Sequence, residues 1–569
     1  MSTFQPHTTS ERSDDIPLIL HWLMQMKLPE VLDEALPSPH GNRQGLSYGQ
    51  LSVVLLSYIM SQADHRLCAV EDWVNQQRQT LTLATGWSIG AKDASDDRLA
   101  DLVEVIGTEV ESREQIERQL GQTMIQAYEL PTEVARCDTS SFSVYHQIDE
   151  AEEATSLLRF GHSKDHRPDL RQYRQLLGTL DPAGVPLVSE TLAGNGADDS
   201  VYTPTWHRLV EVIGHKDFIY IADNKAAVHH TRFQLAKAGG HYCFPLPHTG
   251  HTPHLLKSWV LNPPTPLQEI RLPDSAEEEP AIGVGFEMEL GKLENASDTN
   301  ESFHWWERYL TVRSDALAHR QQKSLRQRLD KTEQALNKLA AKPAKDHCAL
   351  KTKVQTLLKR YRVSDYFATE IYAETVTRYA RPGRPRAKDP VGKIMKSQFK
   401  LKFERQPAAI AEAEQLAGWR IYVTNVKLER LSLSQAVAYY RDQWQLENGF
   451  HRFKRGQLPA LPLYLTNEDR IVGLMFLLTI ALRCFTLIEF QVRRQLQTRR
   501  QELAGLYAGN PKRKTKRPTA EQLLKAFYGI TLYHHRDGAA EMTPLNDLQR
   551  QVLALMKIPE TIYVLPVQT

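Results

Sequence analysis

The sequence predicts an α/β fold with helical regions at both ends and a large insertion. Three short strand-like runs, a helix, a strand, a helix and a strand follow one another between residues 132 and 247, which is the order of an α/β layer. The segments outside this layer have apolar residues at helical spacing. A further strand-like run, at 418–426, comes only after a long interruption, so we expect an insertion into the α/β core.

The pattern divides the chain into six expected parts, beginning with a polar, disordered tail. These parts are the tail (1–14), an N-terminal helical domain (15–130), the first part of the α/β core (131–250), the insertion (251–418), the end of the core with one long helix (419–460), and a C-terminal helical region (461–569). The N-terminal helical domain could bind DNA or only support a core, and its sequence does not decide between the two.

Composition is that of an ordinary globular protein. Of 569 residues, 41% are hydrophobic and 24% charged, and the net charge is +2, so bulk charge does not indicate a polyanionic partner. The five cysteines form no CxxC pair, which favours a reducing cytoplasm. Residues 1–14 lack the apolar core of a signal peptide. The longest apolar run, 471–482, is too short to span a bilayer and predicts a buried helix.

Within the insertion, two apolar repeats predict a pair of short helices that fold back on each other. The first repeat runs from Leu325 to Leu339 and the second from Leu350 to Tyr361, with Pro343 between them. We interpret this pair as a structural hairpin. Before it, Trp305 and Trp306 lie in a strand-like run; paired Trp residues on a strand favour core packing, and stacking on an unpaired base is the alternative.

The stretch from Ser434 to Lys454 is predicted to be one continuous helix. Tyr440, Glu447 and Lys454 recur every seven residues, so on such a helix they share one side at intervals of about 10 Å. A phenol, a carboxylate and an ammonium in one row suit a surface that holds a metal ion at Glu447 and contacts an anionic polymer beside it. A solvated helix face is the alternative interpretation.

Two acidic residues upstream extend this site. Asp138 follows the start of one strand-like run and Asp223 ends another, and α/β sheets gather reactive groups at strand ends. Together with Glu447 they form a candidate carboxylate trio. Three convergent carboxylates require cations, and oxygen ligands without His or Cys favour Mg²⁺ or Mn²⁺. Two such ions can catalyse phosphodiester cleavage.

Positive charge is concentrated in the segment 378–405, which has ten Lys and Arg residues against two acids. Its RPGRPR core places Arg384 and Arg386 in a Gly/Pro frame that cannot be helical. An extended core of this kind can enter a narrow minor groove of DNA, and a basic interdomain linker is the alternative. A second basic run, at 510–518, fits either a phosphate contact or an exposed loop.

These residues resemble bacterial insertion-sequence DDE transposases with an RNase H-like core, and more narrowly the branch with a Y-R-E-K signature. That signature is occupied here by Tyr440, Gln443, Glu447 and Lys454. The segment GHSKDHRPDLRQ (161–172) and the later AGNGADD are also similar to that branch. Gln443 departs from the signature Arg, and Arg441 lies about 200° around a helix from it, so it is not an obvious replacement. Gln can donate a hydrogen bond to phosphate, but without charge assistance.

The resemblance implies an RNase H-like mixed-sheet core in which Asp138, Asp223 and Glu447 hold two Mg²⁺ (or Mn²⁺) ions. Water would cut double-stranded DNA at the transposon ends, and the freed 3′-hydroxyl would attack target DNA. Tyr440, Gln443 and Lys454 would contact DNA near the cut, with Arg441, Arg384 and Arg386 as further candidates. Similar enzymes work as homodimers on paired ends in the bacterial cytoplasm, at the nucleoid. A catalytically silent DNA-binding regulator and a nuclease that cuts without joining are the alternatives.

Overall fold

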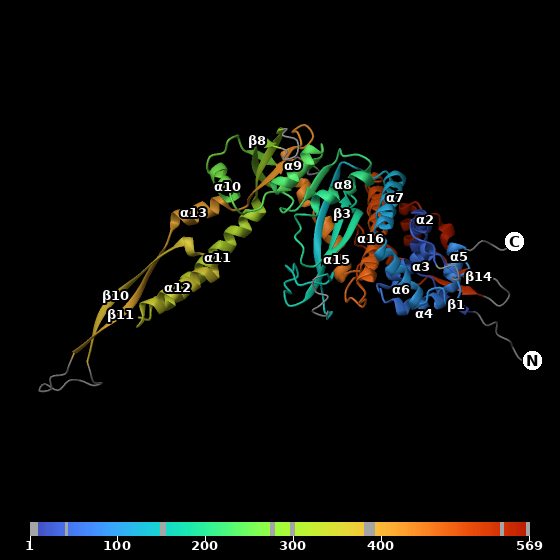
Figure 1. The fold of residues 1–569 in the computed structure, drawn as a ribbon, viewed down its shortest axis with the longest axis horizontal. Coiled ribbons are helices and arrows are strands. Elements are labelled where there is room, and N and C mark those ends of the chain that lie inside the picture. Colours follow the sequence, from blue (N-terminus) through green and yellow to red (C-terminus); the bar gives the residue numbers. More distant parts are fainter. Residues whose placement is uncertain are drawn as a thin grey trace, which may run out of the picture. The chain divides into compact units, whose positions relative to one another are not determined.

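The structure is a computed structural model that describes residues 9–39, 44–147, 155–273, 279–295, 302–379, 393–534 and 540–564. The chain forms two compact units (Figure 1). The first contains Met1–Phe244, Leu293–Trp305 and Tyr439–Thr569, and the second contains Pro245–Lys292 and Trp306–Ala438. The six-part division is finer than this and stays a prediction.

The N-terminal part of the first unit is helical, as the apolar spacing predicts. Its helices are α1 (Ile16–Gln25), α2 (Leu28–Ala35), α3 (Tyr48–Gln62), α4 (Leu67–Gln76), α5 (Arg78–Thr85), α6 (Asp96–Thr108) and α7 (Val110–Tyr128). Ser47 caps α3 through a reciprocal capping box with Gln50. Almost every side chain of α3 is buried, so this helix forms the centre of the bundle.

The prediction of a disordered tail over 1–14 is wrong for the part of it that the structure describes. Strand β1 (Thr9–Arg12) pairs antiparallel with β13 (Thr531–His534), and β14 (Ala540–Met542) completes a three-stranded sheet. The four residues of β1 are polar, and no local pattern in them predicts a strand. Backbone pairing with a segment from the other end of the chain provides the order.

The core sheet of the first unit has the strand order β4-β3-β2-β5-β6. Its strands are β2 (Val134–Val144), β3 (Arg171–Leu180), β4 (Val185–Ala193), β5 (Ile219–Ala222) and β6 (His241–Pro245), with α8 (Tyr202–Ile213) and α9 (His229–Lys237) between the later strands. The first three strands pair antiparallel, and β2, β5 and β6 run parallel. The predicted order of strands and helices is confirmed.

The prediction of a single helix over 434–454 is wrong, because the structure has two helices there. α14 (Leu433–Arg441) ends at Arg441, and α15 (Trp444–Arg455) begins after Gln443. The backbone N–H groups of Gln443, Gln445 and Leu446 donate to the carbonyl three residues earlier, which is 3₁₀ geometry with about three residues per turn. The seven-residue spacing of Tyr440 and Glu447 therefore does not place them on one straight stripe.

The C-terminal part contains α16 (Glu468–Thr498), α17 (Ala520–Lys525), α18 (Asp547–Met556) and the short 3₁₀ helix η2 (Glu560–Tyr563). The region is not entirely helical, because β13 and β14 interrupt it. The apolar run 471–482 lies in α16, which is longer than that run and is long and apolar enough to cross a membrane. Because 94% of its most apolar 18-residue stretch is buried inside the fold, the prediction of a buried helix is confirmed.

The second unit contains the strand order β12-β9-β8-β7 and a helical hairpin. Its elements are α10 (Thr252–Leu261), β7 (Gln268–Ile270), β8 (Gly283–Asn295), β9 (Ser302–Ser314), α11 (Asp315–Ala340), α12 (His347–Tyr361), η1 (Ser364–Tyr366), β10 (Phe367–Tyr379), β11 (Lys393–Arg405), α13 (Pro407–Leu416) and β12 (Trp419–Thr424). β8 and β9 each run a few residues into the first unit. The predicted hairpin is confirmed as α11 and α12.

The two tryptophans of β9 point in opposite directions. Trp305 is buried against Phe233 and Phe303, and its indole N–H donates to the Tyr242 hydroxyl at 3.2 Å. Trp306 is 63% exposed. Successive side chains of a strand alternate between its faces, so core packing holds for Trp305, and base stacking stays a prediction for Trp306 alone.

Candidate active site

Asp138 and Asp223, together the aspartate pair, lie at equivalent positions on neighbouring parallel strands. Cys137 of β2 is the register partner of Ala222 of β5, so Asp138, the next residue of β2, lies beside Asp223, the residue that follows β5. Adjacent strands are about 4.8 Å apart. Both residues belong to the first unit. Asp223 follows the end of β5, as the strand-end argument expects, whereas Asp138 lies inside β2 and not at its end.

Asp138 is a largely buried carboxylate with a cation beside it. Only 16% of its side chain is exposed, and Lys164 Nζ lies 3.6 Å from Oδ1. Burial raises the pKa of Asp138 to about 6; the charge of Lys164 lowers it, and that of Asp223 raises it. The backbone N–H of Thr139 donates to Oδ1 at 2.7 Å. A positive charge is therefore already held next to this carboxylate.

Asp223 is oriented by two donors. The Tyr202 hydroxyl donates to Oδ1 at 2.6 Å, and the backbone N–H of Lys225 donates to the same oxygen at 2.9 Å. Tyr202 begins α8, and burial together with the charge of Asp223 raises its pKa well above the ordinary tyrosine value. The phenol therefore stays protonated and acts as a donor, which leaves Oδ2 of Asp223 available to a cation.

A third buried carboxylate, Asp198, links the segments that carry the aspartate pair. It accepts hydrogen bonds from Arg174 Nη1 at 2.5 Å, Lys225 Nζ at 2.8 Å and Thr139 Oγ1 at 2.9 Å. Lys164 Nζ lies 4.0 Å from its Oδ2. Burial raises the pKa of Asp198, but Lys225, Lys164 and the Thr139 hydroxyl outweigh it and lower the pKa to about 2.

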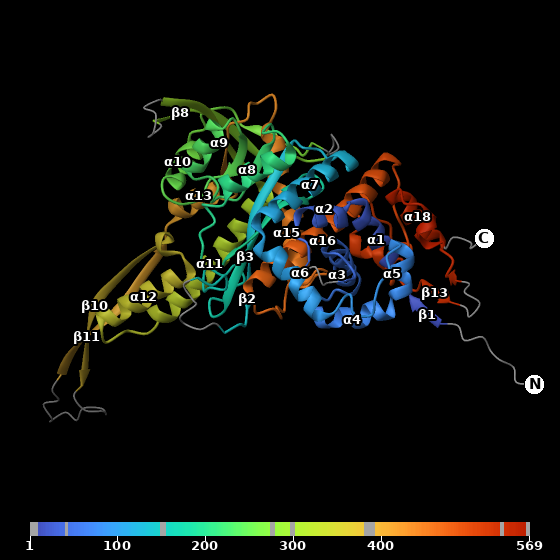
Figure 2. The same cartoon turned by 45° about the vertical axis from the view of Figure 1, so that its right-hand side comes forward.

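Helix α15 covers the face of the sheet on which Asp138 lies. Asp138 and Leu177 are register partners on β2 and β3, and such partners share a face. Gly449 of α15 sits so close that a Cβ there would be 3.6 Å from Leu177 Cδ1. Nearer the start of α15, Gln445 lies against Gly184, in the turn between β3 and β4. Figures 1 and 2 both show α15 beside β3.

Glu447 lies between these two contacts, exposed in the first turn of α15. Among the described residues, no hydrogen bond or ion pair engages its side chain. No group of three or more His, Cys, Asp or Glu side chains within the described ranges is close enough together to hold a metal ion. Three carboxylates repel one another without a cation between them, so a closed trio is not expected in the free chain.

The remaining site candidates lie at or near the start and end of α15. Arg441 is exposed, Gln443 is half-buried at the N-cap of α15, and Tyr440 is half-buried in α14. Lys454 Nζ donates to Asp165 at 2.8 Å and lies 5.2 Å from the centre of the Phe142 ring. Lys454 must therefore release Asp165 before its ammonium group can bind a phosphate. Arg384 and Arg386 fall outside the described residues.

Lys164, Asp198, Tyr202 and Lys225 surround the aspartate pair, and none was among the predicted site residues. Lys164 and Asp198 lie in segments that resemble the Y-R-E-K branch, GHSKDHRPDLRQ and AGNGADD. That resemblance was the one sequence feature that pointed to these two segments. It gave no reason to select the individual side chains, because their role depends on how two loops fold over the sheet.

The donor set around the aspartate pair fits a hard divalent cation. The available ligands are carboxylate oxygens, and Mg²⁺ is commonly bound through one or two carboxylates with water and substrate phosphate. Lys164 already holds a positive charge at the edge of the same site. The pair can therefore accept a cation without rearrangement of the strands. Glu447 is a further carboxylate, exposed on the helix that covers this face of the sheet.

The family described as Transposase DDE domain matches residues 138–484. This stretch begins at Asp138, includes Asp223 and Glu447, and covers more than half of the chain. The protein therefore belongs to this family: it is a DDE transposase, and its mixed sheet with helical terminal regions is an RNase H-like core. The family typically uses divalent metal ions. A comparison with curated proteins found no significant match.

Proposed function

We propose that this transposase cuts the ends of an insertion sequence and joins them to target DNA, as members of the Y-R-E-K branch would. The observation that carries this proposal is the alignment of Asp138 with Asp223 on parallel strands, on a sheet face covered by the Glu447 helix. The trio would hold two Mg²⁺ or Mn²⁺ ions. Bound there, the ions would activate the attacking oxygen and stabilise the leaving oxygen.

The residues of the chain would position the DNA and the ligands. Tyr202 and the Lys225 N–H keep one oxygen of Asp223 engaged, so the other faces the substrate. Lys454, Tyr440, Gln443 and Arg441 would contact phosphates or bases near the cut. In the first step water attacks phosphorus and the bond to the 3′-oxygen breaks. In the second, that 3′-oxygen bonds to a target phosphorus and displaces the target's own 3′-oxygen, so the number of phosphodiester bonds in the joining step is unchanged.

We further propose a homodimer on paired ends, acting on double-stranded DNA at the bacterial nucleoid. The free Cys68, Cys137, Cys243, Cys348 and Cys484 suit the reducing cytoplasm. A dimer would allow each end to be cut within a paired complex, where neither cut is made before both ends are held.

The test is a strand-transfer assay on the DNA that flanks the coding region, with and without Mg²⁺. Asp138→Ala and Glu447→Ala are expected to lower cleavage by at least about a thousandfold while DNA binding is largely kept. Asp199→Ala is the matched control, since this exposed acid lies next to Asp198 without belonging to the trio.

Three outcomes separate the candidate functions. Joined product that needs Mg²⁺ and the trio supports the transposase. Cut product alone indicates a nuclease, and metal-independent binding without cleavage indicates a silent regulator. Equal cleavage by the wild type and both variants contradicts the site.

A further inference from the structure

The near-neutral net charge of the chain is the sum of a region with net positive charge and a remainder with net negative charge. Residues 315–416 contain 23 Lys and Arg against 11 Asp and Glu, which leaves 47 against 57 in the rest of the chain. The basic run 378–405 supplies only ten of these cations. The hairpin of α11 and α12, residues 315–362, supplies 13 against four acids, although its sequence predicts only a structural role.

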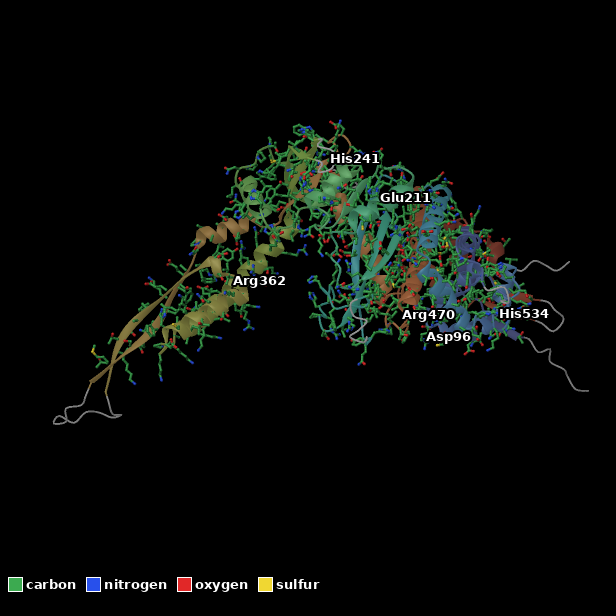
Figure 3. All side chains as sticks on the ribbon, in the orientation of Figure 1. Asp96, Glu211, His241, Arg362, Arg470 and His534 are labelled. Carbon is green, nitrogen blue, oxygen red and sulfur yellow. The ribbon has the colours of Figure 1, made fainter. Side chains whose placement is uncertain are left out.

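The hairpin has a core of its own, so its charges are forced outward. Leu325, Leu329 and Leu336 of α11 pack with Leu350, Val354 and Leu358 of α12 and with Phe367 and Leu401 of the β10–β11 ribbon. Figures 1 and 2 show the two helices side by side along this ribbon. An amphipathic helix with its apolar stripe buried in this way presents its opposite face to solvent. Arg362, labelled in Figure 3, follows the end of α12 and is exposed.

The outer face of α11 carries a row of cations. Arg320, Lys331 and Lys338 are exposed and are separated by 11 and 7 residues, close to three and two turns of a helix. They therefore lie on one side, opposite the buried leucines. Within the described part of the chain, none of the three takes part in an ion pair. We call these three residues the α11 row.

The acids of α11 do not neutralise this row. Asp330 and Glu333 bind Arg405 of β11, at 2.7 and 2.5 Å. Two more ion pairs engage acids around the hairpin: Glu374 of β10 binds Lys400 of β11, and Glu414 of α13 binds Arg326 of α11. The carboxylates are thus engaged by cations on the inner side, and the outer row keeps its charge.

The α11 row has the length and chemistry of a phosphate-contacting surface. Eighteen residues at 1.5 Å each make it about 27 Å long, which is about eight base-pair steps of B-DNA at 3.4 Å. Arg and Lys in such a row can pair with successive phosphates without reading bases. The other residues between them on that side are polar, among them Gln327 and Gln334, so an apolar protein partner has nothing to bury there.

We propose that the outer face of α11 binds the sugar-phosphate backbone of duplex DNA, independently of sequence. The proposal rests on the proposed function only in that DNA is the substrate; it does not depend on catalysis. The hairpin would hold DNA through charge, and the aspartate pair would act on it.

Binding of the full chain to a labelled 40-base-pair duplex of arbitrary sequence, in EDTA and over a series of salt concentrations, tests the α11 row. The triple variant Arg320→Gln, Lys331→Gln, Lys338→Gln is expected to reduce the slope of log affinity against log salt by about 2.7, that is about 0.9 for each phosphate that the protein no longer neutralises. Gln has high helix propensity, and thermal unfolding checks that the fold is kept.

Two control proteins make the outcome decisive. The charge-conserving triple Arg320→Lys, Lys331→Arg, Lys338→Arg should keep the wild-type slope. A triple in the first unit, Lys27→Gln, Arg118→Gln, Lys557→Gln, removes three exposed cations and should change the slope by less than one. Equal slopes for the α11 variant and the wild type overturn the proposal.

The rival partner is the acidic surface of a second copy of the chain. If the α11 variant instead changes the sedimentation of the DNA-free protein and leaves the salt slope intact, the row is an interface between copies and the proposal fails. Because all binding is measured in EDTA, a chain that binds DNA in this way but does not cleave it in Mg²⁺ contradicts the proposed function and leaves the α11 assignment standing.

Discussion

The Lys225 ammonium donates a 2.8 Å hydrogen bond to the buried Asp198 carboxylate. The backbone N–H of the same lysine donates to Asp223, so one residue links a structural anion to a candidate metal ligand. Thr139 repeats the arrangement on the neighbouring strand, since its hydroxyl donates to Asp198 and its backbone N–H donates to Asp138. Asp198 thus fixes the spacing of the aspartate pair.

Asp198→Asn should therefore weaken metal binding. Without the negative charge, Lys164 loses its second carboxylate and stays closer to Asp138, where it competes with a divalent cation. We expect the Mg²⁺ concentration for half-maximal cleavage to rise about tenfold, which is about 1.4 kcal/mol. Direct Mn²⁺ binding, followed by electron paramagnetic resonance, should show the same shift. Asp199→Asn is the matched control, and an equal shift in both variants contradicts the role given to Asp198.

Tyr202→Phe removes the phenol that orients Asp223. A hydrogen bond to a charged group is worth about 1.5–3 kcal/mol, so cleavage should fall roughly tenfold to a hundredfold, with little change in DNA binding. Tyr242→Phe removes a buried phenol one strand further along, where the hydroxyl accepts from Trp305. If both variants lose the same activity, the effect is general destabilisation and not the orientation of Asp223.

Gln443→Arg restores the residue of the Y-R-E-K signature. The side chain starts at the N-cap of α15, four residues before Glu447, and an added guanidinium there could reach a phosphate near the cut. We expect tighter binding to the DNA flanking the coding region and a salt slope larger by about 0.9. Asn448→Arg adds the same charge to the exposed side of α15. An equal gain from both variants shows only a non-specific charge effect.

The sequence predicts those parts of the site that depend on strand order. Asp138 and Asp223 end up side by side because β2 and β5 pair in parallel with Cys137 opposite Ala222. Only Asp223 follows a strand end, since Asp138 lies inside β2. The break before α15 was not predictable in this way. Residues 440–446 contain no Pro or Gly, and only the backbone hydrogen bonds reveal the 3₁₀ turn.

The positions of the residues that surround the aspartate pair depend on contacts between segments that are distant in the sequence. Lys164 comes from a loop before β3, Asp198 from the loop after β4, and Tyr202 from the first turn of α8. Hydrophobic periodicity carries no information about the position that such loops take in the folded chain. Strand β1 is missed for the same reason, because its four polar residues are ordered only by pairing with β13 near the other end of the chain.

Asp15, outside the active site, makes the stability of the folded chain depend on pH. Its side chain is buried, with Ser61 Oγ donating to it at 2.7 Å. Burial raises the pKa of Asp15 to about 7, although the Ser61 hydrogen bond lowers it. The carboxyl group of an unfolded chain titrates near 3.9. Between about pH 4 and pH 7 the folded state therefore binds more protons than the unfolded state.

Stability contributed by the protonated Asp15 is thus present below about pH 4 and is lost as pH rises toward 7. Asp15→Asn keeps an acceptor for Ser61 and cannot ionise, so it should stabilise the fold at pH 8 by up to about 4 kcal/mol. At pH 4 the variant should gain nothing. Thermal unfolding at the two pH values measures the difference, with Asp72→Asn, an exposed acid of α4, as control. A variant that is no more stable than the wild type at pH 8 would show that the buried carboxyl is already compensated when ionised.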